Sequence, residues 1–206
     1  MVKTRREPPT NEPSLGGRGL RLRFAANFVG AMALYFLLTL VVEFPDATLA
    51  ARYPAVGWLL TVNQTVRHAL VLPYQHAIAA ATAGTVNLLG YGATVDGRDI
   101  HSRDFSVTIT GGCDAIELTL LFAAAVAAFP ASFTRKMAGL FAGVIAIAVL
   151  NLVRVVSLWV IGTQWRGAFD LAHFTLWPFV LLCVTMLLFA RWLEFAAPPP
   201  AADRAG

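Results

Sequence analysis

The chain has 206 residues, of which 57% are hydrophobic and only 14% are charged. A soluble domain carries about 25% charged residues, so this composition excludes a long soluble fold and indicates an integral membrane protein. Sixteen Lys and Arg against 12 Asp and Glu give a net charge of +4. The two cysteines are too few for a disulfide framework.

Residues 1–23 are polar and basic and contain several Pro and Gly, a composition typical of a disordered tail. The apolar run 24–42 that follows is 19 residues long. It exceeds the hydrophobic region of a signal peptide, which is about 7–15 residues, so we expect an uncleaved first transmembrane span. Three further apolar runs predict three more spans, at 114–129, 137–161 and 174–190.

Residues 54–91 carry a polar stripe at helical spacing, formed by Asn63, Gln64, Arg67, His68 and Gln75. We expect an amphipathic helical segment at the outer membrane face, re-entrant or broken near Pro73. Farther along, apolar and polar residues alternate from Phe105 to Thr110 after a turn signal at Asp96-Gly97. This pattern predicts one strand of a short hairpin outside the bilayer.

The distribution of basic residues predicts the orientation of the spans. Six Lys or Arg in residues 1–23, together with Arg135 and Lys136, mark the cytoplasmic side. Cys113, the loop at 164–170 and His173 then share the outer face, and Arg154 lies about 10 Å below Ile161. This distribution accounts for the basic charge without nucleic acid as a partner.

The predicted fold is therefore an all-α polytopic membrane protein with about four transmembrane helices, an outer-face helical segment and a short extracytoplasmic β-hairpin. Residues 1–23 form a basic cytoplasmic tail, 24–195 a single integral membrane domain, and 196–206 a Pro/Ala-rich cytoplasmic tail.

Cys113 follows a Gly-Gly pair at the predicted start of a helix. Asp114 and Glu117 have the spacing of a capping box, with Asp114 as the N-cap. A thiol beside a helix N-terminus favours the thiolate, although the Asp114 charge opposes it. For a lone cysteine, simple packing at a loop–helix junction is the more common role.

Arg154 is the strongest single signal, because a guanidinium in an apolar helix needs a partner. Asn151 and Ser157 lie on its face. Two roles remain open: a structural ion pair with Glu117, or an electrophile that binds a substrate carbonyl oxygen.

His173 opens the last span at the predicted depth of Cys113, and Asp170 could orient its imidazole from the preceding turn. His68, His76 and His101 compete but lack this coincidence of depth. A cysteine, an arginine and a histidine that converge on one outer pocket indicate acyl transfer by a thiol.

Other intramembrane chemistries fit less well. No serine has Gly two positions before it, as a rhomboid-type protease requires, and there is no His-Glu-x-x-His zinc motif. An aspartyl intramembrane protease needs two membrane-embedded acids, and Glu117 is the only candidate for such an acid. Cys183 lies about 15 Å deeper than His173, a position typical of packing. We therefore expect no metal and no cofactor.

The sequence resembles the exosortase/archaeosortase family of membrane cysteine transpeptidases over roughly residues 90–190. The matching stretches are Gly111-Gly112-Cys113-Asp114-Ala115-Ile116-Glu117, Asn151-Leu152-Val153-Arg154-Val155-Val156-Ser157 and Phe169-Asp170-Leu171-Ala172-His173. The short length and the Phe-Pro-Ala-Ser stretch at 129–132 are most similar to the compact exosortase H type. The family commonly has a small polar residue and then Gly after the cysteine, where this chain has Asp114-Ala115.

The resemblance implies a multi-pass enzyme of the bacterial cytoplasmic membrane with its active site on the extracytoplasmic side. Its substrates would be exported proteins whose C-terminal signal has a short motif, a transmembrane helix and a basic tail. Cys113 would form a thioester, with His173 as general base and acid and Arg154 on the carbonyl oxygen, before transfer to a surface acceptor. The alternative is a non-enzymatic membrane assembly or transporter subunit with a structural Glu117–Arg154 pair.

Overall fold

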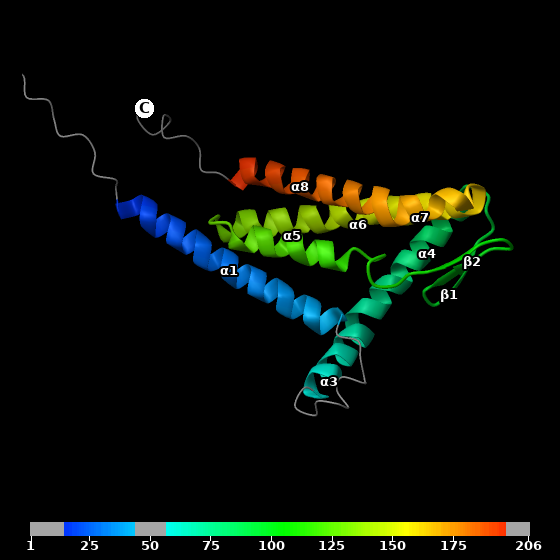
Figure 1. The fold of residues 1–206 in the computed structure, drawn as a ribbon, viewed down its shortest axis with the longest axis horizontal. Coiled ribbons are helices and arrows are strands. Elements are labelled where there is room, and N and C mark those ends of the chain that lie inside the picture. Colours follow the sequence, from blue (N-terminus) through cyan, green and yellow to red (C-terminus); the bar gives the residue numbers. More distant parts are fainter. Residues whose placement is uncertain (1–14, 44–56, 197–206) are drawn as a thin grey trace, which may run out of the picture.

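The computed structural model describes residues 15–43 and 57–196. Four of its helices lie roughly along one direction and a fifth rod of helix crosses them obliquely (Figure 1). The four are α1 (Leu15–Glu43), α5 (Ile116–Ala128), α6 (Phe133–Gln164) and α8 (Trp177–Ala196).

Two segments are long and apolar enough to cross a bilayer, Phe133–Gln164 and Arg166–Ala196. They contain the predicted spans 137–161 and 174–190, and each extends beyond its prediction at both ends. The apolar part of α1, Ala25–Leu40, and helix α5 are shorter. The 13 residues of α5 rise about 20 Å, less than the ~30 Å hydrocarbon core, so the four-span count stays a prediction.

The helices expose large apolar side chains around the bundle. Phe36, Phe141 and Phe179 are 63%, 71% and 65% exposed, respectively. Contiguous apolar surface of this kind is rare on a soluble monomer and is expected where lipid replaces water as the solvent. The outer faces of the helices therefore agree with the membrane location that the composition indicates.

Helix α1 begins at Leu15, inside the segment 1–23 that the sequence predicts to be disordered. The disorder prediction is wrong for residues 15–23, because the sequence has no proline from residue 14 to 43 and its Leu and Arg are good helix formers. Residues 1–14 and 197–206, which hold the rest of the predicted tails, lie outside the described residues. Farther along, α1 packs on α5 through Ala31, Ala124 and Ala128.

Residues 57–88 form the oblique rod: α3 (Gly57–Val66), a π-helical turn (Arg67–Val71) and α4 (Leu72–Leu88). The predicted irregularity near Pro73 is present as the π-helical turn just before it, and Pro73 lies in the first turn of α4. The predicted polar stripe does not lie on one surface: Asn63 and Gln75 are buried, whereas Gln64 is exposed.

The predicted hairpin is a three-stranded antiparallel sheet of β1 (Thr94–Asp96), β2 (Asp99–His101) and β3 (Ser106–Thr108). The alternating stretch at 105–110 supplies β3, and Asp96-Gly97 begins the β1–β2 turn. Gly97 has φ +61°, as the first central residue of a type II′ turn requires. The sequence prediction did not delimit β1 and β2, because neither lies in an alternating run as long as the one at 105–110.

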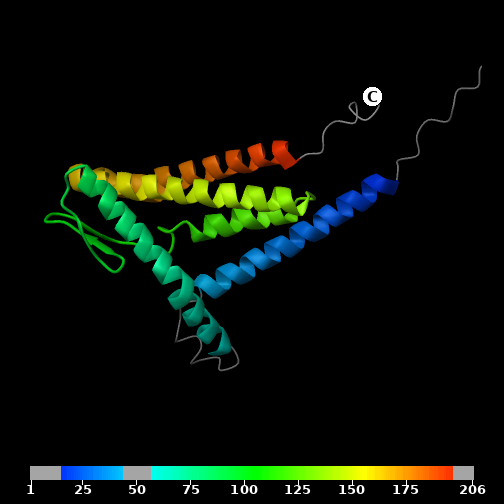
Figure 2. The same ribbon diagram turned by 180° about the vertical axis from the view of Figure 1, so that it is seen from behind.

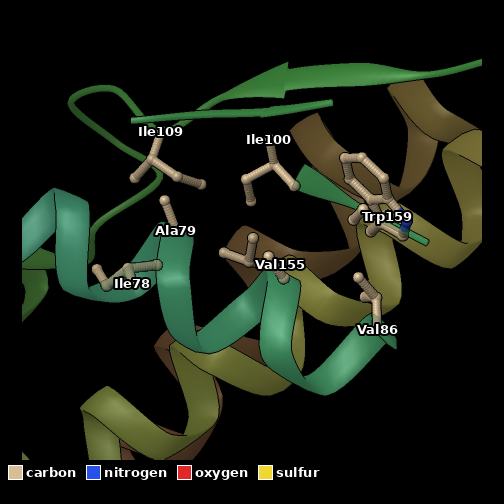
Figure 3. Close-up of a cluster of buried hydrophobic side chains, with 9 residues drawn as sticks. Ile78, Ala79, Val86, Ile100, Ile109, Val155 and Trp159 are labelled. Atoms are coloured by element: carbon tan, nitrogen blue, oxygen red, sulfur yellow. The ribbon is translucent and has the colours of Figure 1, made fainter. Parts of the chain in front are cut away.

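The sheet covers α4 and the C-terminal half of α6, and a buried apolar cluster fills the space between them (Figure 3). Ile100 and Ile109 point from the sheet side toward Ala79 of α4 and Val155 of α6. Trp159, only 1% exposed, closes the cluster. This cluster fixes the sheet against the bundle and so positions the loop that follows β3.

The bundle has two distinct ends (Figures 1 and 2). The start of α1, the α5–α6 connection and the end of α8 lie at one end, and the sheet lies at the other. The positive-inside argument predicts this relative arrangement, because it separates Arg135 and Lys136 from Cys113. Which end faces the cytoplasm stays a prediction.

Two glycines of α6, Gly139 and Gly143, are one helical turn apart and let large aromatic rings approach the helix. A Cβ on Gly139 would overlap the ring of Trp192, and a Cβ on Gly143 would overlap the ring of Phe122. Small residues at this spacing are the usual device for close helix packing in a membrane. They bring α5 and α8 onto α6.

We predict that Gly143→Ala lowers the free energy of unfolding by about 2 kcal/mol, because the Phe122 ring must leave its rotamer or shift the helix. Gly30→Ala on α1 is the matched control, since nothing lies within 4 Å of the added Cβ. The control is expected to be neutral or to stabilise by up to about 1 kcal/mol. Thermal unfolding of the detergent-purified protein compares the two, and equal stability would contradict the packing role of Gly143.

Candidate active site

The loop between β3 and α5 presents Cys113. Its backbone N–H donates to the Thr110 carbonyl oxygen at 3.0 Å, and its side chain is partly buried. The loop needs left-handed backbone on both sides of the cysteine, with φ +79° at Gly112 and +57° at Ala115. Ala115 stands where the family commonly has Gly, and its conformation gives the physical reason for that preference.

The predicted capping box does not form. Helix α5 begins at Ile116, and its N-cap is Ala115, not Asp114. Asp114 instead accepts a hydrogen bond from the Ile116 N–H at 3.1 Å through Oδ1, and Glu117 is exposed. The left-handed turn at Ala115 moves the N-cap one residue beyond Asp114, so Glu117 no longer stands three residues after the N-cap.

Two side chains of α6 hold the backbone of this loop. Arg154, only 4% exposed, donates from Nη1 to the Gly112 carbonyl oxygen at 2.7 Å. One turn earlier, the fully buried Asn151 donates from Nδ2 to the Cys113 carbonyl oxygen at 2.9 Å. Their three-residue spacing on one helix face brings both donors to consecutive carbonyls, so α6 fixes the loop that carries Cys113.

His173 contacts the Cys113 thiol. Its Nε2 lies 3.5 Å from the Cys113 Sγ, and it belongs to a π-helical turn, Ala172–Leu176, that precedes α8. A π-helical turn inside an α-helix is frequently found at functional sites. The widened turn is the local feature that the sequence did not reveal.

Aromatic rings, not Asp170, orient the imidazole. Phe169 stacks on His173 with an interplanar angle of 11° and centroids 5.5 Å apart, and Phe174 packs edge-on at 4.5 Å. Asp170 is exposed, and no hydrogen bond joins it to His173. Asp170 lies in the short helix α7 (Phe169–Leu171), and it forms no hydrogen bond that would orient the imidazole as predicted.

The structure also lacks the predicted alternative pairing of Arg154. Within residues 57–196, no ion pair joins Glu117 to Arg154, and Arg191–Glu194 is the salt bridge found there. The Arg154 side chain is committed to the loop carbonyl of Gly112 instead. The other candidates lie apart as well: His68, His76 and His101 are exposed, and Cys183 is a free thiol within α8.

Cys113, Arg154 and His173 line one small cavity of about 20 Å³ together with apolar and aromatic residues of the sheet, α6 and α7. Its volume admits about one water molecule. A second cavity of about 270 Å³ is lined by Gly112, Arg154 and residues of α5 and α8. The guanidinium therefore borders both spaces, with its Nε buried and unpaired.

Sequence reasoning missed a buried polar group beside the residue that follows Cys113. Gln75 of α4 donates to Asp114 Oδ2 at 2.7 Å, and Arg98 of the β1–β2 turn donates to Gln75 Oε1 at 3.1 Å. The only available signal was the place of Gln75 in the polar stripe, which does not reveal a partner 39 residues away.

Comparison with known protein families identifies a match for this chain. The family described as transmembrane exosortase matches residues 15–190 of the chain. No curated protein and no solved structure matches the chain. The match extends the resemblance at residues 90–190 toward the N-terminus, to the first residue of α1.

We predict that Asn151→Asp lowers the free energy of unfolding by about 2 kcal/mol or more. The change removes the N–H that the Cys113 carbonyl accepts and buries a charge at a fully buried position. The same amide-to-acid change at the exposed Gln64 is the control and is expected to have little effect. Thermal unfolding measures both, and an unchanged Asn151→Asp protein would show that the loop does not need this bond.

Proposed function

Because the chain belongs to the transmembrane exosortase family, we propose that it is a cysteine transpeptidase that cleaves C-terminal sorting signals of exported proteins. The observation that carries the proposal is the 3.5 Å contact between Cys113 Sγ and His173 Nε2. Beside it, Arg154 Nη1 donates to the Gly112 carbonyl oxygen at 2.7 Å.

The first half of the proposed reaction forms a thioester. The Cys113 thiol gives its proton to Nε2 of His173, and Sγ attacks the carbonyl carbon of the scissile peptide bond. As the C–N bond breaks, the leaving amine takes the proton from Nε2 and departs with the rest of the sorting signal. The exported protein is then joined to Sγ.

Arg154 is the group we assign to the developing oxyanion. Its guanidinium is buried and always charged. Nη1 donates to the Gly112 carbonyl oxygen, and Nε has no partner. A fixed charge-assisted donor in a water-poor site stabilises a tetrahedral intermediate strongly. Asn151 supports this step by holding the cysteine carbonyl.

The second half transfers the acyl group to a surface acceptor. The acceptor nucleophile gives its proton to Nε2 of His173 and attacks the thioester carbonyl, and the C–S bond breaks. Sγ recovers the proton, so the enzyme is regenerated and no cofactor is consumed. The site lies at the sheet end of the bundle, which we propose faces the extracytoplasmic side of the bacterial cytoplasmic membrane, with both termini cytoplasmic.

The alternative, a non-enzymatic membrane subunit, loses the feature on which it depended. It required a structural Glu117–Arg154 ion pair, and Arg154 is bound to the Gly112 carbonyl oxygen instead. The contact between Cys113 and His173 favours the enzyme.

We predict that Cys113→Ala and Cys113→Ser each abolish processing of a co-expressed exported protein that carries a C-terminal motif, an apolar helix and a basic tail. The reason is that no thioester forms without the thiol. Immunoblots of substrate size and of enzyme accumulation measure the outcome. Cys183→Ala is the matched control and should process normally, and normal processing by Cys113→Ala would refute the proposal.

We predict that Arg154→Lys lowers the processing rate by about 100-fold or more, because an ammonium cannot hold the loop carbonyl and an oxyanion in the same planar fork. Arg191→Lys is the control, since Arg191 forms an exposed pair with Glu194 at the other end of the bundle. Rates come from pulse-labelled substrate. If Arg154→Lys retains normal rates, the residue has only a structural role.

A further inference from the structure

A carboxylate lies directly next to the proposed nucleophile. Asp114 is only 2% exposed, and it stands where the family commonly has a small polar residue. A negative charge this close disfavours a thiolate at Cys113. The proposed reaction does not use Asp114, so its burial beside the cysteine needs another explanation.

Gln75 and Arg98 satisfy this carboxylate in a chain of hydrogen bonds. Gln75, 1% exposed, donates to Asp114 Oδ2 at 2.7 Å, while the Ile116 N–H donates to Oδ1. Arg98 donates to Gln75 Oε1 at 3.1 Å. The amide is therefore held at both ends, and hydrogen bonds with one charged partner are the stronger kind.

The two supporting residues stand on rigid parts of the fold. Gln75 lies in α4, one turn before the buried cluster residues Ile78 and Ala79. Arg98 lies in the β1–β2 turn, and its carbonyl oxygen accepts a hydrogen bond from the Ile109 N–H at 3.0 Å. The helix and the sheet thus both act on the residue that follows the cysteine.

We propose that Gln75 is a positioning residue which, with Arg98, fixes and compensates the Asp114 carboxylate beside Cys113, and so holds the thiol in place opposite His173. The inference rests on the proposed function only in taking Cys113 as the nucleophile. Gln75 acts through Asp114 and touches neither the thiol nor the imidazole.

The charged groups around Cys113 and Asp114 determine which interactions a variant at Gln75 alters. Burial and, next, the charge of Asp114 raise the pKa of Tyr74 on α4. Tyr74 and Arg154 face Asp114, and Arg154 and His173 face Cys113. Arg98 reaches Asp114 only through Gln75, and Asp170 acts on His173. Loss of the Gln75 amide leaves all of these in place and removes only the link between Arg98 and Asp114.

The test is the rate at which iodoacetamide alkylates Cys113, measured against pH in the full-length protein with Cys183→Ala as background. In Gln75→Leu we expect the pH of half-maximal rate to rise by about one unit, because Asp114 is then less compensated. Gln64→Leu, the same change at an exposed site of α3, is the control and should match the parent.

A double-mutant cycle separates positioning from a general structural role. In an Asp114→Ser background, Gln75→Leu should no longer shift the profile, because the charge that Gln75 compensates is gone. An unchanged profile in Gln75→Leu, or an equal shift with and without Asp114, would overturn the proposal. If Gln75→Leu does not accumulate, Arg98→Met provides the same test. We expect a smaller rise in the pH of half-maximal alkylation rate, and an unchanged value would contradict the proposal.

Processing of a substrate, measured in parallel, distinguishes the two proposals. A shifted alkylation profile with no processing in the parent protein would refute the transpeptidase and leave the positioning role intact. Normal processing in the parent with an unshifted Gln75→Leu profile would support the transpeptidase and refute the positioning role of Gln75.

Discussion

Buried hydrogen bonds hold three consecutive residues of the loop between β3 and α5. Arg154 binds the Gly112 carbonyl, Asn151 binds the Cys113 carbonyl, and Gln75 binds the Asp114 carboxylate. Each donor is at least nine-tenths buried, where an unpaired polar group costs about 1–3 kcal/mol. Because a shift of the loop would leave several such groups unpaired at once, the position of the thiol is strongly determined.

The rest of the fold supports this loop. Close packing at Gly139 and Gly143 brings α5 and α8 onto α6, so the helix that carries Asn151 and Arg154 lies beside the one that follows His173. The buried cluster around Trp159 fixes the sheet and α4 on the same part of α6. Aromatic stacking on the imidazole face then directs Nε2 at the ring edge toward the cysteine sulfur. Sequence spacing had assigned this orienting role to Asp170.

The mixture of polar and apolar contacts follows from the solvent. In a bilayer the outer faces of the helices gain nothing from polarity, so the polar residues of the spans turn inward and meet one another. Arg154 and Asn151 therefore contact the loop, and the polar stripe of residues 54–91 divides into buried and exposed members. Where charge is scarce, each buried polar group constrains the structure more than it would in a soluble protein.

The sequence by itself determined the membrane class, the two long spans, the strand at 105–110 and the three residues proposed for catalysis. These follow from composition, local periodicity and the cost of a charge in an apolar helix, all of which act within a short stretch of chain. Only the tertiary structure decided the start of α5, the role of Phe169 and the link from Arg98 through Gln75 to Asp114. Those features depend on contacts between segments 23 to 39 residues apart and on left-handed and π-helical backbone, which short-range patterns do not encode.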